Sequence, residues 1–512
     1  MGRSRKPKVN FGDLNQIADR AVSQPLSDEE HHRLKAALRE LEGFMTPADR
    51  PSEKAKDLFP GTDQQPSSTG PRRGGRGRNG SDEFSSASKT TVPHESLKSG
   101  DTCPECQKGK LYNRKDPGVL WRFVAQALVA IQKYELERLK CNVCDAIFTA
   151  SPPPGVGEDK YDESVPAALA VCRYGAGIPS HRLEQLMAQF RVPLPHSTQW
   201  ELVSESADLL QSLVNELIRQ AADSSVIHTD DTSMRVLEQK RHLPAERTGT
   251  FTTGMVTERA EGRIALYFTG EQHCGENLSD LLRHRAANLP KPVVMFDASS
   301  RNRPKEDGQF VKLTMANCMS HARRNFVNVL DNFPSECRHL VVELGRVFAH
   351  DAQAKELGFD AQARLTYHQT YSEPILTELQ KWSRNLFEQK LVEPNSGLGK
   401  ALQYLDNHWT PLTEFLRTPG CPISNNICER AIKKMVLYRK NSLFYRNENG
   451  SSVGDVYMSI IHTCELNGVP AFEYLVALLR NADLVQANPG EWLPWTYRDN
   501  QPEAPTLAAS VV

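Results

Sequence analysis

The spacing of apolar and polar positions predicts helices in the first part of the chain. Residues 1–48 carry apolar side chains at helical intervals, such as Leu34, Leu38 and Leu41, which predicts a helical pair or coiled-coil arm. The segment 151–222 opens with the breaker SPPPGVGEDK and then returns to helical spacing. Two short helical patterns precede a long one there, an arrangement that resembles a helix-turn-helix but is also common in helical bundles. This segment is therefore expected to bind DNA or to support multimerisation.

The next segment, residues 223–310, changes to β-rich runs separated by turn residues. The runs are VIHTDD (226–231), TGTFTTGMVT (248–257), RIALYFT (263–269) and PVVMFDAS (292–299). A helical stretch, ENLSDLLRHRA, separates the last two runs, and strands around one crossover helix predict an α/β core. Residues 311–420 are expected to be helical. Residues 421–475 include one more amphipathic helix, and 476–512 are assigned to a C-terminal tail.

Composition identifies a linker. Residues 49–100 are rich in Pro, Ser, Gly and Arg, and they contain too few apolar side chains to offset the entropy of folding, which predicts disorder. The run PRRGGRGRNG (71–80) contains four arginines that could touch phosphates without sequence preference. A solvated linker is an equally good interpretation of this run.

The length of 512 residues allows about three to five folded units, so a multidomain chain is expected. Lys and Arg total 62 against 63 Asp and Glu, a net charge of −1, which excludes a protein held to polyanions by bulk charge alone. Contacts to nucleic acid must then come from local basic patches. The sequence has neither a long apolar run nor a signal-like apolar segment, so no membrane contact and a cytoplasmic location are expected.

Two Cys-x-x-Cys pairs indicate a metal site within residues 101–150. Cys103 and Cys106 form the first pair, and Cys141 and Cys144 form the second, with 34 residues between the pairs. Each pair can aim two thiolates at one tetrahedral centre, so together they predict a structural Zn²⁺ site in a zinc-ribbon-like module. Four buried thiols without metal would be the simpler alternative, but two matched pairs argue against it.

Two aspartates follow β-rich runs directly. Asp230 closes VIHT and Asp297 closes PVVMF, so both carboxylates are expected at the carboxyl ends of strands, where open α/β sheets place ligands. Because strand residues alternate between faces, only one of Asp230 and Asp231 can point into a shared site, and Asp230 is favoured. Glu429 lies on the predicted helix NNICERAIKKMVLYRKN, which Asn425 and Asn426 could cap.

Together the three carboxylates predict a site for two divalent ions, Mg²⁺ or Mn²⁺ in its place, that activates an oxygen nucleophile and stabilises a leaving oxygen at phosphorus. Asp297 could instead be a turn residue, and Glu429 could be a surface partner of Lys433. What favours Glu429 is the basic run after it, which contains no acidic residue. The run consists of Arg430, Lys433, Lys434, Arg439, Lys440 and Arg446, interleaved with Tyr438, Phe444 and Tyr445.

Such a run is expected to bind DNA phosphates and stack on bases, although a solvated helix face is the alternative. A second basic cluster, at His321, Arg323 and Arg324, is expected to contact the DNA backbone or a scissile phosphate. A surface helix without a ligand is the alternative for these three residues.

These motifs together resemble the DDE transposases of the insertion-sequence-66 family, the large subunit encoded by bacterial mobile elements. The resemblance covers nearly the whole chain. It rests on CPEC and CNVC, SHRLEQLMAQFRVPLPHSTQWE, HTDDTSMRVL, FDASSRN, ANCMSHARRNF, EPNSGLGKAL, SNNICERAIKKMVLYRKNSLFYRNENG and VGDVYMSIIHTCELNG. The chain departs from the family pattern at Asp231, where Glu is frequent, at Met319, where Trp is frequent, and at Ser424, where Asp is frequent.

The resemblance implies a ribonuclease-H-like catalytic core, formed by residues 223–310 and 421–475, with Asp230, Asp297 and Glu429 as its acidic triad. It implies a long helical insertion between the second Asp and the Glu, and the separation 429 − 297 = 132 agrees. Cleavage at the element ends, joining of the 3′-hydroxyl to target DNA, homo-oligomers on double-stranded DNA and small companion proteins are also implied. A catalytically inactive zinc-containing DNA-binding protein derived from a transposase is the main alternative, and a nuclease or resolvase on the same core is another.

Overall fold

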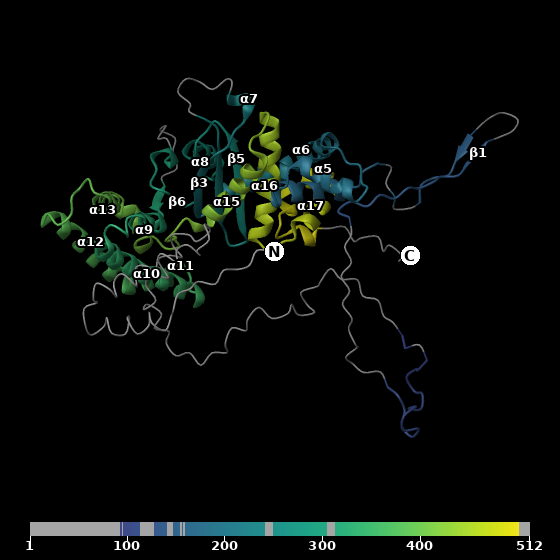
Figure 1. Cartoon of the computed structure of the whole chain (residues 1–512), viewed down its shortest axis with the longest axis horizontal. Coiled ribbons are helices and arrows are strands. Elements are labelled where there is room, and N and C mark those ends of the chain that lie inside the picture. The colour runs from purple at the N-terminus through teal and green to yellow at the C-terminus, as the bar shows by residue number, and fades with distance from the viewer. Residues whose placement is uncertain are drawn as a thin grey trace, which may run out of the picture. The chain divides into compact units, whose positions relative to one another are not determined.

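The computed structural model describes the chain in several stretches (Figure 1). They are residues 93–94, 96–112, 127–140, 147–153, 156, 159–240, 249–304 and 313–500. The chain forms two compact units, one of residues 61–127 and one that includes residues 128–512. The predicted helical arm over 1–48 and most of the predicted linker over 49–100 lie outside the described residues.

The larger unit combines strands and helices. The strands are β1 (Arg138–Lys140), β2 (Ile147–Thr149), β3 (Val226–Ser233), β4 (Phe251–Glu258), β5 (Arg263–Gly270), β6 (Val293–Phe296) and β7 (Thr314–Asn317). The helices before and between the strands of the sheet are α4 (Ser164–Ala170), α5 (Ser180–Gln189), α6 (His196–Ala222), α7 (Leu237–Lys240) and α8 (Cys274–Leu282). The later helices are α9 (Met319–Asn328), α10 (Pro334–Glu356), α11 (Ala361–Tyr371), α12 (Glu373–Glu388), α13 (Gly397–Asn407), α14 (Trp409–Leu412), α15 (Asn426–Ser442), α16 (Glu448–Leu466), α17 (Ala471–Arg480) and α18 (Ala482–Ala487).

Strands β3 to β7 form one mixed sheet in the order β5-β4-β3-β6-β7, while β1 and β2 form a separate hairpin. Strands β5, β4 and β3 are antiparallel, and β6 and β7 run parallel to β3. The four strands predicted within 223–310, and the helix α8 between two of them, are confirmed. Strand β7 was not predicted, because TMAN lies at the start of a segment with helical spacing.

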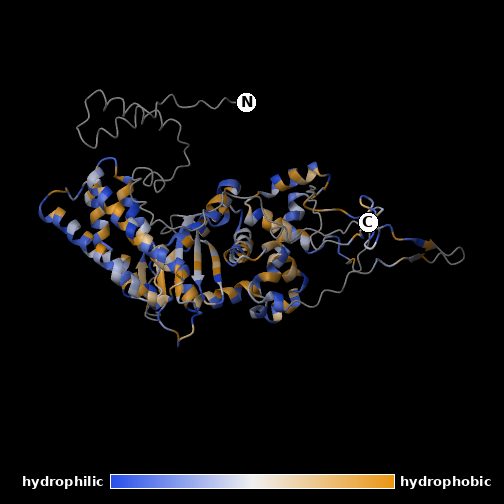
Figure 2. Cartoon of the chain, turned by 90° about the horizontal axis from the view of Figure 1, so that it is seen from below, coloured by the Kyte–Doolittle hydropathy of each residue, from blue (hydrophilic) through white to orange (hydrophobic). Residues whose placement is uncertain are grey.

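The sheet separates two apolar cores. Along β6, Val294 and Phe296 belong to one core, whereas Val293 and Met295 belong to the other, as alternation along a strand requires. The second core is shared with α9, α10, α12 and α13 from the segment expected to be helical. Figure 1 shows the sheet between these helices and the group of α5, α6 and α17, and Figure 2 shows apolar and polar faces on the same helices.

The helical segment before the sheet joins the first core. A π-helical turn, η3 (Val171–Gly175), continues α4 and carries Tyr174, which is 1% exposed. The Tyr174 ring stacks on Tyr438 of α15 and on Tyr457 of α16, with centroid distances of 5.7 and 5.5 Å. Tyr438 also stacks on Tyr445 at 5.4 Å. This tyrosine cluster connects residues far apart in the sequence.

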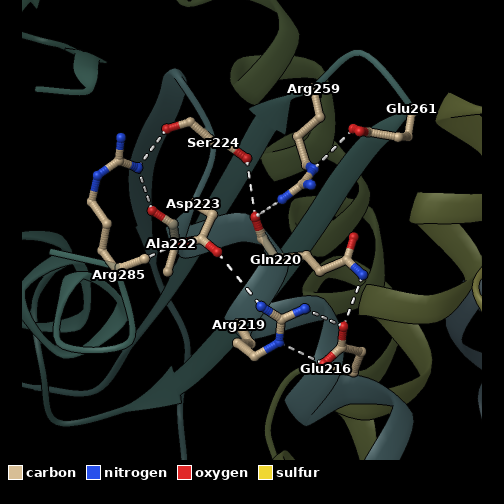
Figure 3. A network of polar contacts seen from close by, with 10 residues as sticks. Glu216, Arg219, Gln220, Ala222, Asp223, Ser224, Arg259, Glu261 and Arg285 are labelled. Carbon is tan, nitrogen blue, oxygen red and sulfur yellow. Dashed lines mark hydrogen bonds and ion pairs between the residues drawn. The ribbon is translucent and has the colours of Figure 1, made fainter. Parts of the chain in front are cut away.

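A polar network closes the turn between α6 and β3 (Figure 3). Arg285, after α8, donates to the carbonyl oxygens of Ala222 and Ser224 at 2.6 and 2.8 Å. Arg259, after β4, donates to the carbonyl oxygen of Gln220 at 2.7 Å. The two arginines therefore bind the backbone carbonyls at the end of α6 and in the turn that leads into β3.

Helix α16 covers the outer edge of β5. Four side chains at intervals of four residues accept hydrogen bonds from four strand N–H groups at intervals of two residues. The pairs are Asp455 with Thr269, Ser459 with Tyr267, Thr463 with Ala265 and Asn467 with Arg263, at 2.6, 3.0, 3.0 and 2.9 Å. The spacing matches because four helical residues and two strand residues both advance by about 6–7 Å. We call these four pairs the edge contacts.

Residues 476–500, expected as part of a C-terminal tail, include the end of α17 and all of α18, and Trp492 and Tyr497 are 2% and 3% exposed. Within the described stretches, no helix has both the length and the apolar composition needed to cross a membrane.

Candidate active site

The two predicted aspartates lie at matching positions on adjacent parallel strands. His228 of β3 is in register with Met295 of β6, and Asp230 and Asp297 each follow two residues later. Adjacent strands are about 4.8 Å apart, so the two carboxylates leave the sheet side by side. The carboxylate of the neighbouring Asp231 contacts His273 instead, with 3.3 Å between its Oδ2 and Nδ1 of His273.

Glu429 reaches the same place from α15, which contacts both β3 and β4. Gly254, the register partner of Asp230 on β4, allows this close approach, since a Cβ there would lie 2.7 Å from Cδ1 of Ile432. The thiol of Cys428 donates to the carbonyl oxygen of Gly254 at 3.2 Å. The helix carrying Glu429 therefore rests on the strand beside Asp230.

Asn425 fixes the start of α15, although not as the predicted cap. Its side chain makes no capping hydrogen bond within the helix. Instead, Nδ2 donates to the carbonyl oxygen of Thr229 at 2.9 Å, and Oδ1 lies 3.1 Å from Nδ1 of His228. The beginning of the Glu429 helix is thus attached to the strand that carries Asp230.

The electrostatics of Asp230 reflect the acidic residues around it. Burial, and then the negative charges of Asp297, Asp231 and Glu429, together raise the pKa of the Asp230 carboxyl to about 7, against one backbone hydrogen bond that lowers it. Within the described residues, the structure thus brings together the carboxylates that sequence spacing selected.

Helix α9 supplies the positive side of the site. Nη2 of Arg324 lies 3.3 Å from Oε2 of Glu429, and Nδ1 of His321 lies 3.7 Å from Oε1. Burial lowers the pKa of His321, partly opposed by Glu429. Both residues were predicted only as DNA contacts, and they therefore also face the third carboxylate. The ion-pair partner of Glu429 is Arg324, where the sequence offered Lys433 as the structural alternative. Arg323 is partly buried.

Two further residues lie close to Asp297. Asn302 donates its side-chain amide to Oδ1 of Asp297, and the backbone N–H of Ser299 donates to the same oxygen at 3.1 Å. Tyr404, on α13 of the helical insertion, has its pKa raised to about 12 by burial and then by the charge of Asp297. Asn302 follows Asp297 in FDASSRN, but no sequence signal connects Tyr404 to the site.

The basic run after Glu429 divides into two sets. Arg430, Lys433, Lys440 and Arg446 are exposed, which suits contacts to a ligand. By contrast, Lys434 pairs with Glu465 at 2.9 Å, and Arg439 donates to Ser233 Oγ at 2.8 Å. The expectation that three interleaved aromatics stack on bases is wrong for two of them. Tyr438 and Tyr445 are 1% and 3% exposed within the tyrosine cluster, whereas Phe444 is exposed.

The first Cys-x-x-Cys pair lies in a tight turn of the smaller unit. The backbone N–H of Cys103 donates to the carbonyl oxygen of Gly109 at 2.8 Å. Hydrogen bonds from the backbone of Lys108 and Gly109 lower the pKa of the Cys106 thiol, which favours the thiolate that binds metal. Cys141 and Cys144 lie outside the described residues, so the four-cysteine zinc centre stays a prediction.

Comparison with known proteins agrees with the motifs. "Uncharacterized protein y4jD" of Sinorhizobium fredii (strain NBRC 101917 / NGR234) is 24% identical over 389 residues, 74% of this chain and 75% of the relative. "Uncharacterized protein y4hP" of the same strain is 22% identical over 404 residues, 73% of this chain and 69% of the relative. Residues 160–452, more than half of the 512-residue chain, match the family described as "Transposase IS66 family". The chain therefore belongs to the transposase IS66 family.

Proposed function

We propose that this chain is a DDE transposase that cleaves phosphodiesters at the ends of its mobile element and joins the freed 3′-hydroxyl ends to target DNA. The observation that carries the proposal is the approach of Asp230, Asp297 and Glu429 from two parallel strands and one helix. The sheet order, with three antiparallel strands followed by two parallel ones, supports a ribonuclease-H-like core. Family membership supports DNA as the substrate.

The acidic group fits a Mg²⁺ site, with Mn²⁺ as a substitute. All three side chains offer carboxylate oxygens, the donors that these ions prefer. The raised pKa of Asp230, caused by burial and by the neighbouring acids, indicates negative charge that a cation would neutralise. When bound, two such ions supply an activated oxygen nucleophile and stabilise the leaving oxygen.

The chain's own side chains would orient the reacting groups. Asn302 holds one oxygen of Asp297, which leaves the other oxygen for a cation. Arg324 lies against Glu429 and is about half exposed, so its guanidinium can also reach a scissile phosphate. The exposed basic residues of α15 and the following turn would bind the double-stranded DNA of element ends and target. They are Arg430, Lys433, Lys440 and Arg446.

Assembly and metal content extend the proposal. Two element ends must be held together for joining, so a homo-oligomer on DNA is expected, with small companion proteins of the same element as further partners. The Cys-x-x-Cys pairs would hold Zn²⁺ in a module that recognises the ends or supports the multimer.

A cleavage and joining assay tests the proposal. Purified protein, labelled element-end DNA and Mg²⁺ should give cut strands and joined products on a denaturing gel. Asp230→Asn, Asp297→Asn and Glu429→Gln should each abolish both products while retaining DNA binding. Asp231→Asn is the matched control, because this adjacent acid faces His273, and it should keep most of the activity.

Each other outcome has a defined meaning. Cut ends without joined products would favour a nuclease or resolvase. Binding of element ends without any cleavage by the unsubstituted chain would favour the inactive DNA-binding protein. Unchanged cleavage in one of the three variants would refute the role of that residue.

A further inference from the structure

Three different metal-ligand side chains meet beside the proposed catalytic carboxylates. Cys318 precedes α9, His321 lies in its first turn, and Glu429 lies in the first turn of α15. One ligand atom from each, the Cys318 Sγ, a His321 ring nitrogen and a Glu429 carboxylate oxygen, lies within 4.8 Å of the other two. Thiolate, imidazole and carboxylate together are donors of Zn²⁺ sites, and an all-oxygen Mg²⁺ site would not require the first two.

Two of these ligand atoms are buried without a partner. Nδ1 of His321 and Oε1 of Glu429 have no hydrogen bond within the described residues, and 3.7 Å separates them. Buried polar atoms almost always have a hydrogen-bond partner, so a facing pair without one is unusual in a site without a ligand. A cation between them would satisfy both atoms.

The third atom is held in position by the backbone. Cys318 is 0% exposed, and its Sγ accepts a hydrogen bond from the backbone N–H of Asn425 at 3.1 Å. The sulfur is therefore fixed on the side of the site where α15 begins.

We propose that Cys318, His321 and Glu429 form a second divalent metal site, selective for Zn²⁺ over Mg²⁺. Binding replaces the thiol proton of Cys318 with the metal and releases that proton to solvent. Three protein ligands leave a fourth tetrahedral position for water.

The shared ligand connects this site to the proposed function. Glu429 cannot serve both ions fully, so Zn²⁺ at this site would withdraw Glu429 from Asp230 and Asp297. Zn²⁺ is then expected to inhibit the Mg²⁺-dependent reaction. This consequence rests on the proposed transposase activity, whereas the binding itself does not.

Metal binding is tested first, with Co²⁺ as a spectroscopic substitute for Zn²⁺. The full chain and Cys318→Ser are titrated, and the thiolate-to-cobalt absorption is compared as a difference spectrum. Both chains keep the two Cys-x-x-Cys pairs, so the contribution of those pairs cancels. Cys337→Ser is the matched control, because Cys337 is also 0% exposed but lies outside the cluster.

The expected result is a cobalt–thiolate band that Cys318→Ser loses and Cys337→Ser retains. His321→Gln removes a direct ligand. The Co²⁺ affinity read from the same band should therefore fall by more than the roughly tenfold that loss of an outer-shell partner costs. An identical titration of the full chain and Cys318→Ser would overturn the proposal. Folding of each variant is checked by circular dichroism, and Ser keeps an acceptor for the Asn425 N–H.

The activity experiment is read separately. Zn²⁺ is added to the Mg²⁺ reaction, and each variant is compared with its own zinc-free rate. The full chain and Cys337→Ser should be inhibited at lower Zn²⁺ than Cys318→Ser, and equal sensitivity would refute the inhibitory role. If the chain never cleaves DNA, the proposed function fails while the cobalt result still decides whether the site exists.

Discussion

Asn425 donates a hydrogen bond from its side-chain amide to the carbonyl oxygen of Thr229, 2.9 Å away and 196 residues earlier in the chain. Thr229 directly precedes Asp230, and Asn425 directly precedes the helix that carries Glu429. One buried amide therefore ties the strand that carries Asp230 to the helix that carries Glu429.

Asn425→Ala should weaken both the fold and the proposed reaction. The side chain is 0% exposed, and its loss leaves the Thr229 carbonyl and His228 without their partner, which costs about 1–3 kcal/mol. Chemical denaturation should show this loss, and cleavage should fall because α15 can shift. Asn426→Ala, at the exposed neighbouring position, is the control and should change neither quantity much.

Asp230→Asn should stabilise the metal-free protein more at pH 8 than at pH 5. Burial and then Asp297 raise the folded-state pKa of Asp230 to about 7 from its ordinary value of 3.8, so the folded state holds a proton that the unfolded state releases. The destabilisation of the folded state by Asp230 grows as pH rises from the unfolded-state pKa to the folded-state pKa, and then levels off. At pH 8 the gain should be on the order of 2–4 kcal/mol.

Denaturation in EDTA at the two pH values measures this gain. Equal stabilisation at pH 5 and pH 8 would contradict the explanation. Mg²⁺ should stabilise the unsubstituted chain and have a smaller effect on Asp230→Asn, since a ligand that binds only the folded state adds stability.

Ser459→Ala should destabilise the sheet edge. The serine Oγ accepts from the N–H of Tyr267 at 3.0 Å, and that buried donor would lose its partner, at a cost of about 1–3 kcal/mol. Ser452→Ala, on the same helix but exposed, removes no edge contact and serves as the control. Similar unfolding midpoints for the two variants would show that the edge contact contributes little.

Replacing Lys433 and Lys440 by Ala should weaken DNA binding and reduce its salt dependence. Both are exposed and lie seven residues apart on one side of α15, so both can face the same backbone. Each lost phosphate contact lowers the slope of log affinity against log salt by about 0.9. Fluorescence anisotropy across a salt series measures the slope, and the control is Lys381→Ala with Lys400→Ala, two exposed lysines of the insertion.

Local patterns were enough to predict most elements, and they also selected the three acidic residues of the candidate site. Runs such as PVVMF are apolar and end in Asp297, so strand and site follow from neighbouring residues. Strand β7 could not be predicted this way, because TMAN is short and its pairing with β6 is a tertiary property. The burial of Tyr438 within a basic run depends on Tyr174, which lies 264 positions earlier by 438 − 174.

The same limit applies to the site. Asn425 has the composition of a helix cap, and only the folded chain places its amide on Thr229. His321 and Arg324 have the composition of a phosphate-binding cluster, and their approach to Glu429 depends on how α9 and α15 meet.

The edge contacts between α16 and β5 also restrict how copies of the chain can associate. An uncovered edge strand would offer its N–H and C=O groups to a strand of a second molecule and invite aggregation. Here Asp455, Ser459, Thr463 and Asn467 already accept from the four outward N–H groups of β5, and Thr463 and Asn467 also donate to the carbonyls of Ala265 and Arg263. A second copy of the chain could therefore not extend the sheet along β5 without first breaking these bonds, and a contact at that border would be made through the outward side chains of α16.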